Sequence, residues 1–188
     1  TIRLADGLCG IQKDDVDTVT ICGMGGKLMK DIIEAGKDRL SNGMQLILSP
    51  QSEVREFRAY LLENGIDILS EMMIKDEGKY YFIMDCVYHD MAEGAVYNNN
   101  THLQGKNAAE YTEEELRYGR YLIDNHSEVL KEYLDKEYGS FISIQKSLKE
   151  QNVKKPSAAI EKRLQELEAD IEYNRKAELS CCAQDAQK

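Results

Sequence analysis

Residues 1–88 alternate short apolar runs with longer stretches in which apolar residues recur every three to four positions. The runs at 2–5, 17–22 and 45–48 are predicted to be strands, because β-branched and apolar residues dominate them and turn residues follow. The stretches 26–40 and 53–64 are predicted to be helices, because their apolar residues fall on one face. This alternation is typical of βαβ units with a parallel sheet, so we expect an α/β fold.

Two further strands are predicted at 66–75 and 80–88. The segment between them, Asp76-Glu77-Gly78-Lys79, is too short for a helix and contains the glycine that a hairpin turn requires. The two strands are therefore expected to pair antiparallel. The sheet is predicted to begin as a parallel one and to end in an antiparallel hairpin.

The C-terminal half has a different pattern. Residues 89–111 are polar and aperiodic and are predicted to be a loop, whereas a helix capped at Thr112 is expected to run through Leu122. Helices at 127–151 and 157–179 should pack antiparallel as a coiled-coil hairpin, because apolar residues recur along both. The expected inner positions are Leu130, Leu134, Phe141, Ile144, Leu148, Ile160, Leu164, Leu167 and Ile171. The predicted domains are 1–90, a linker at 91–111, a helical domain at 112–180 and a tail at 181–188.

Composition narrows the function classes. Lys and Arg number 24 against 34 Asp and Glu, a net charge of −10, which argues against a protein whose main task is gripping a polyanion. A local exception is the basic tip, which contains Lys146, Lys149, Lys154, Lys155, Lys162 and Arg163 with only two acidic residues among them. Such a run is either a solvated helix end or a nucleic-acid contact.

The cysteines, the histidines and the hydropathy argue against a disulfide-rich, a metal-binding and a membrane protein. The five cysteines are odd in number and form no C-x-x-C pair, and the three histidines are dispersed, so we predict neither a disulfide framework nor a metal site. No run approaches the ~20 apolar residues of a membrane span, and no signal-peptide core opens the chain. We expect a cytoplasmic protein that does not contact membranes.

Four short motifs occur in order along the first 88 residues, each at the end of a predicted strand or in the last turn. They are Ala5-Asp6-Gly7-Leu8, Ile21-Cys22-Gly23-Met24-Gly25-Gly26, Leu46-Ile47-Leu48-Ser49-Pro50-Gln51 and Glu77-Gly78-Lys79-Tyr80-Tyr81. Ligands of open α/β sheets bind outside the carboxyl ends of the strands. Together these motifs resemble the bacterial TrmK family, S-adenosylmethionine-dependent methyltransferases that modify N1 of adenine-22 in tRNA.

The resemblance implies a partial Rossmann-like class I methyltransferase sheet followed by a C-terminal coiled coil. It implies S-adenosylmethionine as cofactor and tRNA as partner. Residues Gly23, Met24, Gly25 and Gly26 correspond to the loop where base and methyl group meet, and they are the expected catalytic segment. Asp6, Gly7, Gly23 and Met24 are the expected cofactor contacts, with the Asp6 carboxylate accepting from the adenine amino group.

Substrate contacts are expected at Pro50, Gln51, Lys79 and Tyr80, together with Lys149, Lys154 and Lys155 of the basic tip. From the residues alone, plainer structural roles fit the same positions. Asp6 and Gly7 suit an ordinary turn, the glycines suit any tight strand-to-helix connection, and Lys79 could simply project into water.

The chain also departs from the family pattern. Cys22 stands where alanine is expected, and Ser49-Pro50-Gln51 stands where Gln-Pro-Asn is usual. The acidic-glycine motif D-I-G-[ST] that holds the cofactor after the first strand is not found in these residues. We therefore expect an N-terminally truncated member of the family.

Two other hypotheses compete. A non-catalytic protein that associates with itself or a partner through its C-terminal helices would account for the acidic charge and the missing motif. A nucleotide-dependent oxidoreductase is less well supported, because Gly23-Met24-Gly25-Gly26 lacks the G-x-G-x-x-G spacing.

Overall fold

The computed structural model describes residues 2–90 and 108–183. They divide into two compact units, Thr1–Thr112 and Glu113–Lys188. Most of the expected linker, residues 91–107, and the end of the expected tail, residues 184–188, lie outside the described residues.

The first unit contains a four-stranded sheet in the order β1-β2-β4-β3. The strands are β1 (Thr18–Met24), β2 (Gln45–Pro50), β3 (Ile66–Asp76) and β4 (Lys79–Tyr88). β1 and β2 are parallel, whereas β4 pairs antiparallel with both β2 and β3. The predicted parallel start and antiparallel end of the sheet are confirmed.

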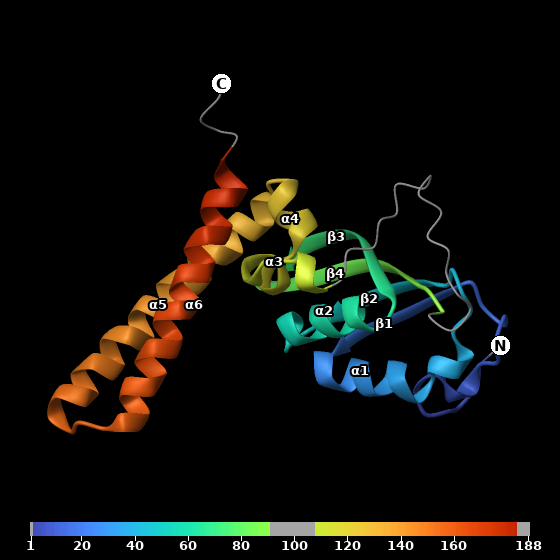
Figure 1. Ribbon diagram of the computed structural model, residues 1–188, viewed down its shortest axis with the longest axis horizontal. Helices are drawn as coiled ribbons and strands as arrows, with labels where there is room; N and C mark the ends of the chain where they lie inside the picture. The colour runs from blue at the N-terminus through green and yellow to red at the C-terminus, as the bar shows by residue number, and fades with distance from the viewer. Residues whose placement is uncertain (1, 91–107, 184–188) are drawn as a thin grey trace. The chain divides into compact units, whose positions relative to one another are not determined.

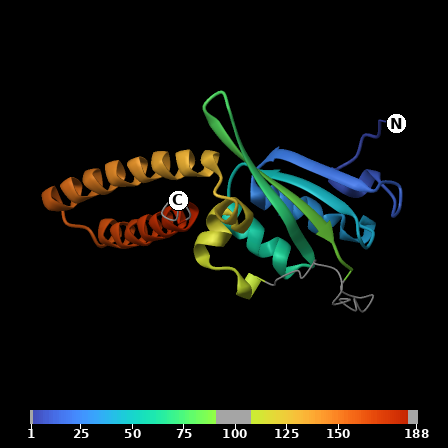
Figure 2. The same cartoon turned by 90° about the horizontal axis from the view of Figure 1, so that it is seen from above.

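Helices α1 (Gly26–Ala35) and α2 (Val54–Glu63) cover the same face of this sheet (Figures 1 and 2). In β1 the residues that face them, Val19 and Ile21, are buried, and the alternate residues are exposed. Strand and helix side chains interleave because each element presents one apolar face. The fully buried apolar residues of this unit are Met29, Ile33, Leu46, Leu48, Phe57, Leu61, Ile66, Met84 and Cys86.

A buried ion pair ties α2 to β3. Nε of Arg58 lies 2.7 Å from Oε1 of Glu71, and the two side chains are 0% and 1% exposed. The guanidinium also lies over the ring of Phe82 at 5.0 Å from its centroid. Moving two charged side chains out of water costs free energy. The fold tolerates this pair because the two charges lie at hydrogen-bond distance from each other.

Two predicted elements of this unit were wrong in extent. Residues 2–5 form no strand, and Ile2 and Leu4 are fully exposed, because no described strand lies beside them to complete a ladder. The helix predicted to reach residue 40 ends at Ala35 and is followed by the short 3-10 turn η2 (Lys37–Arg39). Leu8 packs so closely on Gly36 that a Cβ there would lie 2.4 Å from the Cβ of Leu8.

The second unit is helical. After the 3-10 turn η4 (Ala108–Glu110), which still belongs to the first unit, come α3 (Glu113–Tyr118) and α4 (Arg120–Asp124). One continuous helix was expected here. The break occurs at Gly119, whose φ of +94° is open to glycine but not to a helical residue with a side chain.

The long helices α5 (Glu128–Lys154) and α6 (Ala158–Cys182) pack side by side in antiparallel directions (Figure 1). Leu130, Leu134 and Leu167, three of the predicted inner positions, are fully buried. Ile144 was expected on this inner face but is 44% exposed. Its neighbour Gln145 is half-buried instead. The inner positions run from Leu134 to Phe141, a step of seven, and then to Gln145, a step of four.

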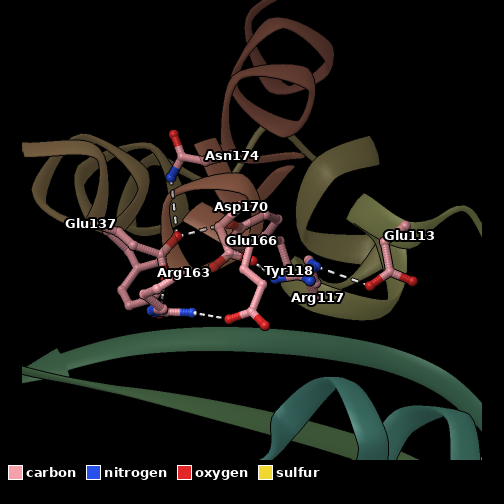
Figure 3. A network of polar contacts seen from close by, with 9 residues as sticks. Glu113, Arg117, Tyr118, Glu137, Arg163, Glu166, Asp170 and Asn174 are labelled. Carbon is pink, nitrogen blue, oxygen red and sulfur yellow. Dashed lines mark hydrogen bonds and ion pairs between the residues drawn. The ribbon is translucent and has the colours of Figure 1, made fainter. Parts of the chain in front are cut away.

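A polar network interrupts the apolar packing of this hairpin (Figure 3). The side-chain amide of Asn174, 1% exposed, donates to the Leu134 carbonyl at 3.1 Å and to the Glu137 carboxylate at 3.0 Å. Glu137 also accepts from the hydroxyls of Tyr118 and Tyr133, at 2.7 and 2.9 Å. Burial, with Glu137 next to it, raises the pKa of Tyr118 well above the usual range, so this hydroxyl stays protonated and donates.

A second set of contacts ties α3 to α6. The Arg117 guanidinium bridges Glu113 of its own helix, at 2.9 Å, and Asp170 of α6, at 3.0 Å. The same group lies over the ring of Tyr173, 4.9 Å from its centroid. These contacts hold the short helix against the hairpin.

Candidate functional site

The carboxyl ends of β1 and β2 bring two of the predicted motifs together. Met24 pairs with Pro50 in the ladder, and the backbone N–H of Gln51 donates to the Met24 carbonyl at 2.9 Å. One turn further, the N–H of Gly26 donates to the Ser52 carbonyl at 2.9 Å. The expected catalytic segment and the expected substrate residues Pro50 and Gln51 are therefore neighbours.

The glycines of this loop lack a side chain for different structural reasons. Gly23 has a φ of +79°, and a Cβ added to it would meet nothing within 4 Å, so its backbone faces open space. At Gly26 a Cβ would lie 2.9 Å from Phe57 and from two backbone carbonyls of the α2 start. At Gly25 it would lie 2.6 Å from the hydroxyl of Ser52.

Bare backbone was expected along the whole loop, and the structure limits it to Gly23. The space beside Gly25 and Gly26 is filled by the corner that leads into α2. The absence of side chains at these two positions is explained by packing.

Asp6 and Gly7 lie elsewhere. A Cβ on Gly7 would lie 3.0 Å from Ile32, which is six residues along α1 from Gly26. Because α1 runs back along the sheet, Ile32 is nearer the opposite edge, about 9 Å along the helix axis. The Asp6 carbonyl accepts from the N–H of Cys9 at 3.1 Å, and no hydrogen bond of the described residues joins either residue to Gly23 or Met24.

A hollow of about 370 Å³ opens next to Gly7. Its lining includes Arg3 and Asp15, whose side chains form an ion pair at 2.5 Å. The guanidinium beside it lowers the pKa of the Asp15 carboxyl. This hollow contains no residue of the Gly23–Gly26 loop.

Lys79 and Tyr80 lie at the tip of the β3–β4 hairpin. Because β4 is antiparallel to β2, its first residues extend past the carboxyl end of β2, on the same edge as the glycine loop. Glu77 and Gly78 make the turn with φ of +46° and +78°. The ammonium of Lys75 lies over one face of the Tyr80 ring, 5.6 Å from its centroid.

A second hollow, of about 270 Å³, borders the glycine loop itself. It lies between the first turns of α1 and α2 and is lined by Gly26, Lys27, Lys30, Glu53, Glu56 and Phe57. Sequence reasoning missed Lys27, Lys30, Glu53 and Glu56, because surface charges at helix starts carry no signal of their own. Only the proximity of the two helix starts identifies them.

The remaining predicted residues, Lys149, Lys154 and Lys155, belong to the second unit. Lys149 is on α5, Lys154 is its last residue and Lys155 follows as its C-cap; all three are exposed. They share the basic tip with Lys146, Lys162 and Arg163, the last two on α6.

Other kinds of site were searched for among the described residues. In that part of the chain no three His, Cys, Asp or Glu side chains gather as metal ligands would. None of its helices combines the length and the apolar character that crossing a membrane demands.

Comparison with known proteins identifies relatives. The model of the family "TrmK: tRNA (adenine(22)-N(1))-methyltransferase" matches residues 1–169. A tRNA (adenine(22)-N(1))-methyltransferase of Bacillus subtilis is 37% identical over 84 residues, which is 45% of this chain and 35% of the relative.

Solved structures share the fold. The B. subtilis TrmK crystal structure superposes with a TM-score of 0.73 at 24% identity, covering 95% of this chain and 70% of that one. A Streptococcus pneumoniae protein solved in complex with S-adenosyl-L-methionine has a TM-score of 0.71 at 24% identity, covering 94% of this chain and 67% of that one. This chain thus spans about a third of the curated relative and about two thirds of these structures.

The family match covers residues 1–169, which is most of the chain. The oxidoreductase hypothesis is set aside. The chain belongs to the TrmK family of tRNA (adenine(22)-N(1))-methyltransferases.

Proposed function

We propose that this chain takes part in methyl transfer from S-adenosylmethionine to N1 of an adenine in tRNA. One observation carries the proposal: the carboxyl ends of β1 and β2 meet at Gly23–Gln51, and the Gly23 backbone there faces open space. A planar base can approach a backbone without side chains to within contact distance. The family match indicates that the reaction at this position is methyl transfer to an adenine.

The residues present fit one side of the cofactor. Gly23 leaves room that a side chain would fill, so Gly23 and Met24 would contact the cofactor near its reactive end. Asp6, which neighbours Gly7 nearer the opposite edge of the sheet, lies outside this contact, and its geometry does not support the adenine contact expected of it. When bound, S-adenosylmethionine supplies an electrophilic methyl group on a sulfonium.

The chain's own contribution is alignment. The open Gly23 backbone and the neighbouring Pro50–Gln51 segment would hold the base so that its N1 lone pair faces the methyl group. The Gln51 side chain is exposed beside this loop and can donate to or accept from the base edge. Lys79 and Tyr80 at the hairpin tip would contact the RNA next to the target, the lysine through a phosphate and the tyrosine by stacking.

The basic tip would bind the body of the tRNA. Residues 146–163 hold six basic and two acidic residues, whereas the rest of the second unit, 113–145 and 164–188, holds seven basic and 14 acidic. Positive charge is therefore concentrated at the end of the hairpin. Phosphates are attracted to such a concentration even on an acidic protein.

Location and self-association remain predictions. A cytoplasmic location follows from the tRNA substrate. Self-association would use the exposed apolar residues of the hairpin, Ile142, Ile144 and Val153.

The experiment that tests the proposal uses this chain as it stands. Titration calorimetry with S-adenosylmethionine should give binding in the micromolar range, and incubation with unmodified tRNA should yield 1-methyladenosine by nucleoside mass spectrometry. Gly23→Val, which fills the open space, should abolish both signals. If the unmodified chain binds no cofactor and leaves tRNA unmethylated, the non-catalytic interaction protein becomes the better description.

A further inference from the structure

Methylation at N1 turns a neutral adenine into a cation, and this inference rests on the proposed function. The N1 lone pair forms the new N–CH₃ bond, the S–CH₃ bond breaks, and its electron pair stays on sulfur. The charge that leaves the sulfonium appears on the base, shared between N1 and the exocyclic N6 amino group. A carboxylate fixed beside N6 would favour this change, because it attracts charge that develops in the transition state.

One carboxylate is placed against the glycine loop. A Cβ on Gly25 would lie 3.1 Å from Oε2 of Glu53, so the carboxylate rests directly on the backbone of the expected catalytic segment. It also lines the 270 Å³ hollow that includes Gly26. Among the groups around that hollow, Glu56 lies one turn further along α2, and no described contact joins it to the loop.

The Glu53 side chain has no structural task in its own helix. Glu53 occupies the N-cap position of α2, but its carboxylate makes no capping hydrogen bond. The hydroxyl of Ser52 donates to Oε2 and so directs the carboxylate towards Gly25.

We propose that Glu53 is a catalytic residue whose carboxylate accepts a hydrogen bond from N6 of the target adenine. It stabilises the positive charge that forms on the base and selects an amino group at that position. No proton has to leave, because the product base keeps its charge beside the carboxylate. Lys27 and Lys30 line the same hollow and offer cations for the phosphate of the nucleotide.

The test measures charge preference without cofactor and without turnover. The chain is titrated by NMR with adenosine 5′-monophosphate and with its 1-methyl derivative, which is cationic on the base at neutral pH. The unmodified chain should bind the methylated nucleotide about fivefold more tightly, the advantage of an exposed ion pair. Glu53→Gln, which keeps the size and removes the charge, should bind both nucleotides equally.

Glu56→Gln is the matched control, since it removes the same charge from the same hollow and should keep the fivefold preference. A preference that survives in Glu53→Gln overturns the role of Glu53, as does an unmodified chain that shows no preference. Neither result contradicts the proposed methyl transfer if calorimetry shows that the chain binds S-adenosylmethionine. A chain that binds neither nucleotide overturns the role of Glu53, and negative calorimetry would remove the proposed function as well.

Discussion

Single residues at the carboxyl edge of the sheet have requirements that their neighbours set. Gly26 needs to lack a side chain because the backbone of Ser52 and Glu53 and the side chain of Phe57 surround it. Gly23 needs its left-handed φ, but it has free space around it. The two glycines should therefore respond differently to alanine.

Gly26→Ala is expected to lower the free energy of unfolding by about 2 kcal/mol, because carbonyl oxygens at 2.9 Å must move to admit the methyl group. Gly23→Ala should cost only about 1 kcal/mol, the strain of a left-handed alanine. Urea denaturation followed by circular dichroism measures both. Equal stability of the parent and Gly26→Ala would contradict the role of packing at this glycine.

The backbone conformation of Glu53 is unfavourable for stability, although its side chain has a proposed role in the site. Its φ of +48° and ψ of +39° place it in the left-handed region, where a glutamate is strained and a glycine is not. Such strain at a candidate site is consistent with a side chain kept for its chemistry.

At the scale of elements, the helical hairpin depends on one buried polar residue. Asn174 joins α6 to α5 through the Leu134 carbonyl and the Glu137 carboxylate, next to the buried Leu134 and Leu167. A buried amide that has partners at only one axial alignment disfavours sliding of one helix along the other.

Asn174→Ala is expected to lower the free energy of unfolding of the hairpin by about 2 kcal/mol, because it removes two hydrogen bonds and leaves space between the helices. Thermal unfolding monitored at 222 nm measures the change. Gln165→Ala, on the exposed face of the same helix, is the control and should shift the midpoint little. Equal shifts for the two variants would show that the network contributes nothing specific.

At the scale of the whole molecule, charge is distributed unevenly on an acidic chain. The net charge of −10 opposes non-specific binding to RNA, so an RNA contact must come from a local concentration of cations. The basic tip is the clearest such concentration in the second unit.

Replacing Lys149, Lys154 and Lys155 together with glutamine is expected to weaken tRNA binding and to flatten its salt dependence. The slope of log K against log salt should fall by roughly 0.7–0.9 for each phosphate that the tip no longer neutralises. Filter binding at several salt concentrations measures it. Replacing Lys131, Lys136 and Lys176, which lie on α5 and α6 outside the basic tip, removes the same charge and should leave the slope nearly unchanged. Equal effects of the two triple variants would exclude a specific role for the tip.

Much of the fold could be predicted from the sequence. β-branched runs, amphipathic helices and the Asp76–Lys79 turn indicated the strands, the helices and the antiparallel hairpin, because these depend on local periodicity and turn chemistry. The glycine motif and the Pro50–Gln51 segment were also recognisable, since each lies at the carboxyl end of a strand. Element ends were less predictable: Gly119 divides a helix by its φ, and Leu8 packs against Gly36 from far along the chain.

The sequence by itself determined four strands, most of the helices and the motifs at the strand ends, because these properties reside in neighbouring residues. Only the tertiary structure decided which glycine is open, where Gly7 lies and that Glu53 rests on Gly25. These depend on segments far apart in the chain that meet when the helices pack on the sheet. A surface glutamate at a helix start has no pattern of its own, and only the fold places its charge beside the loop.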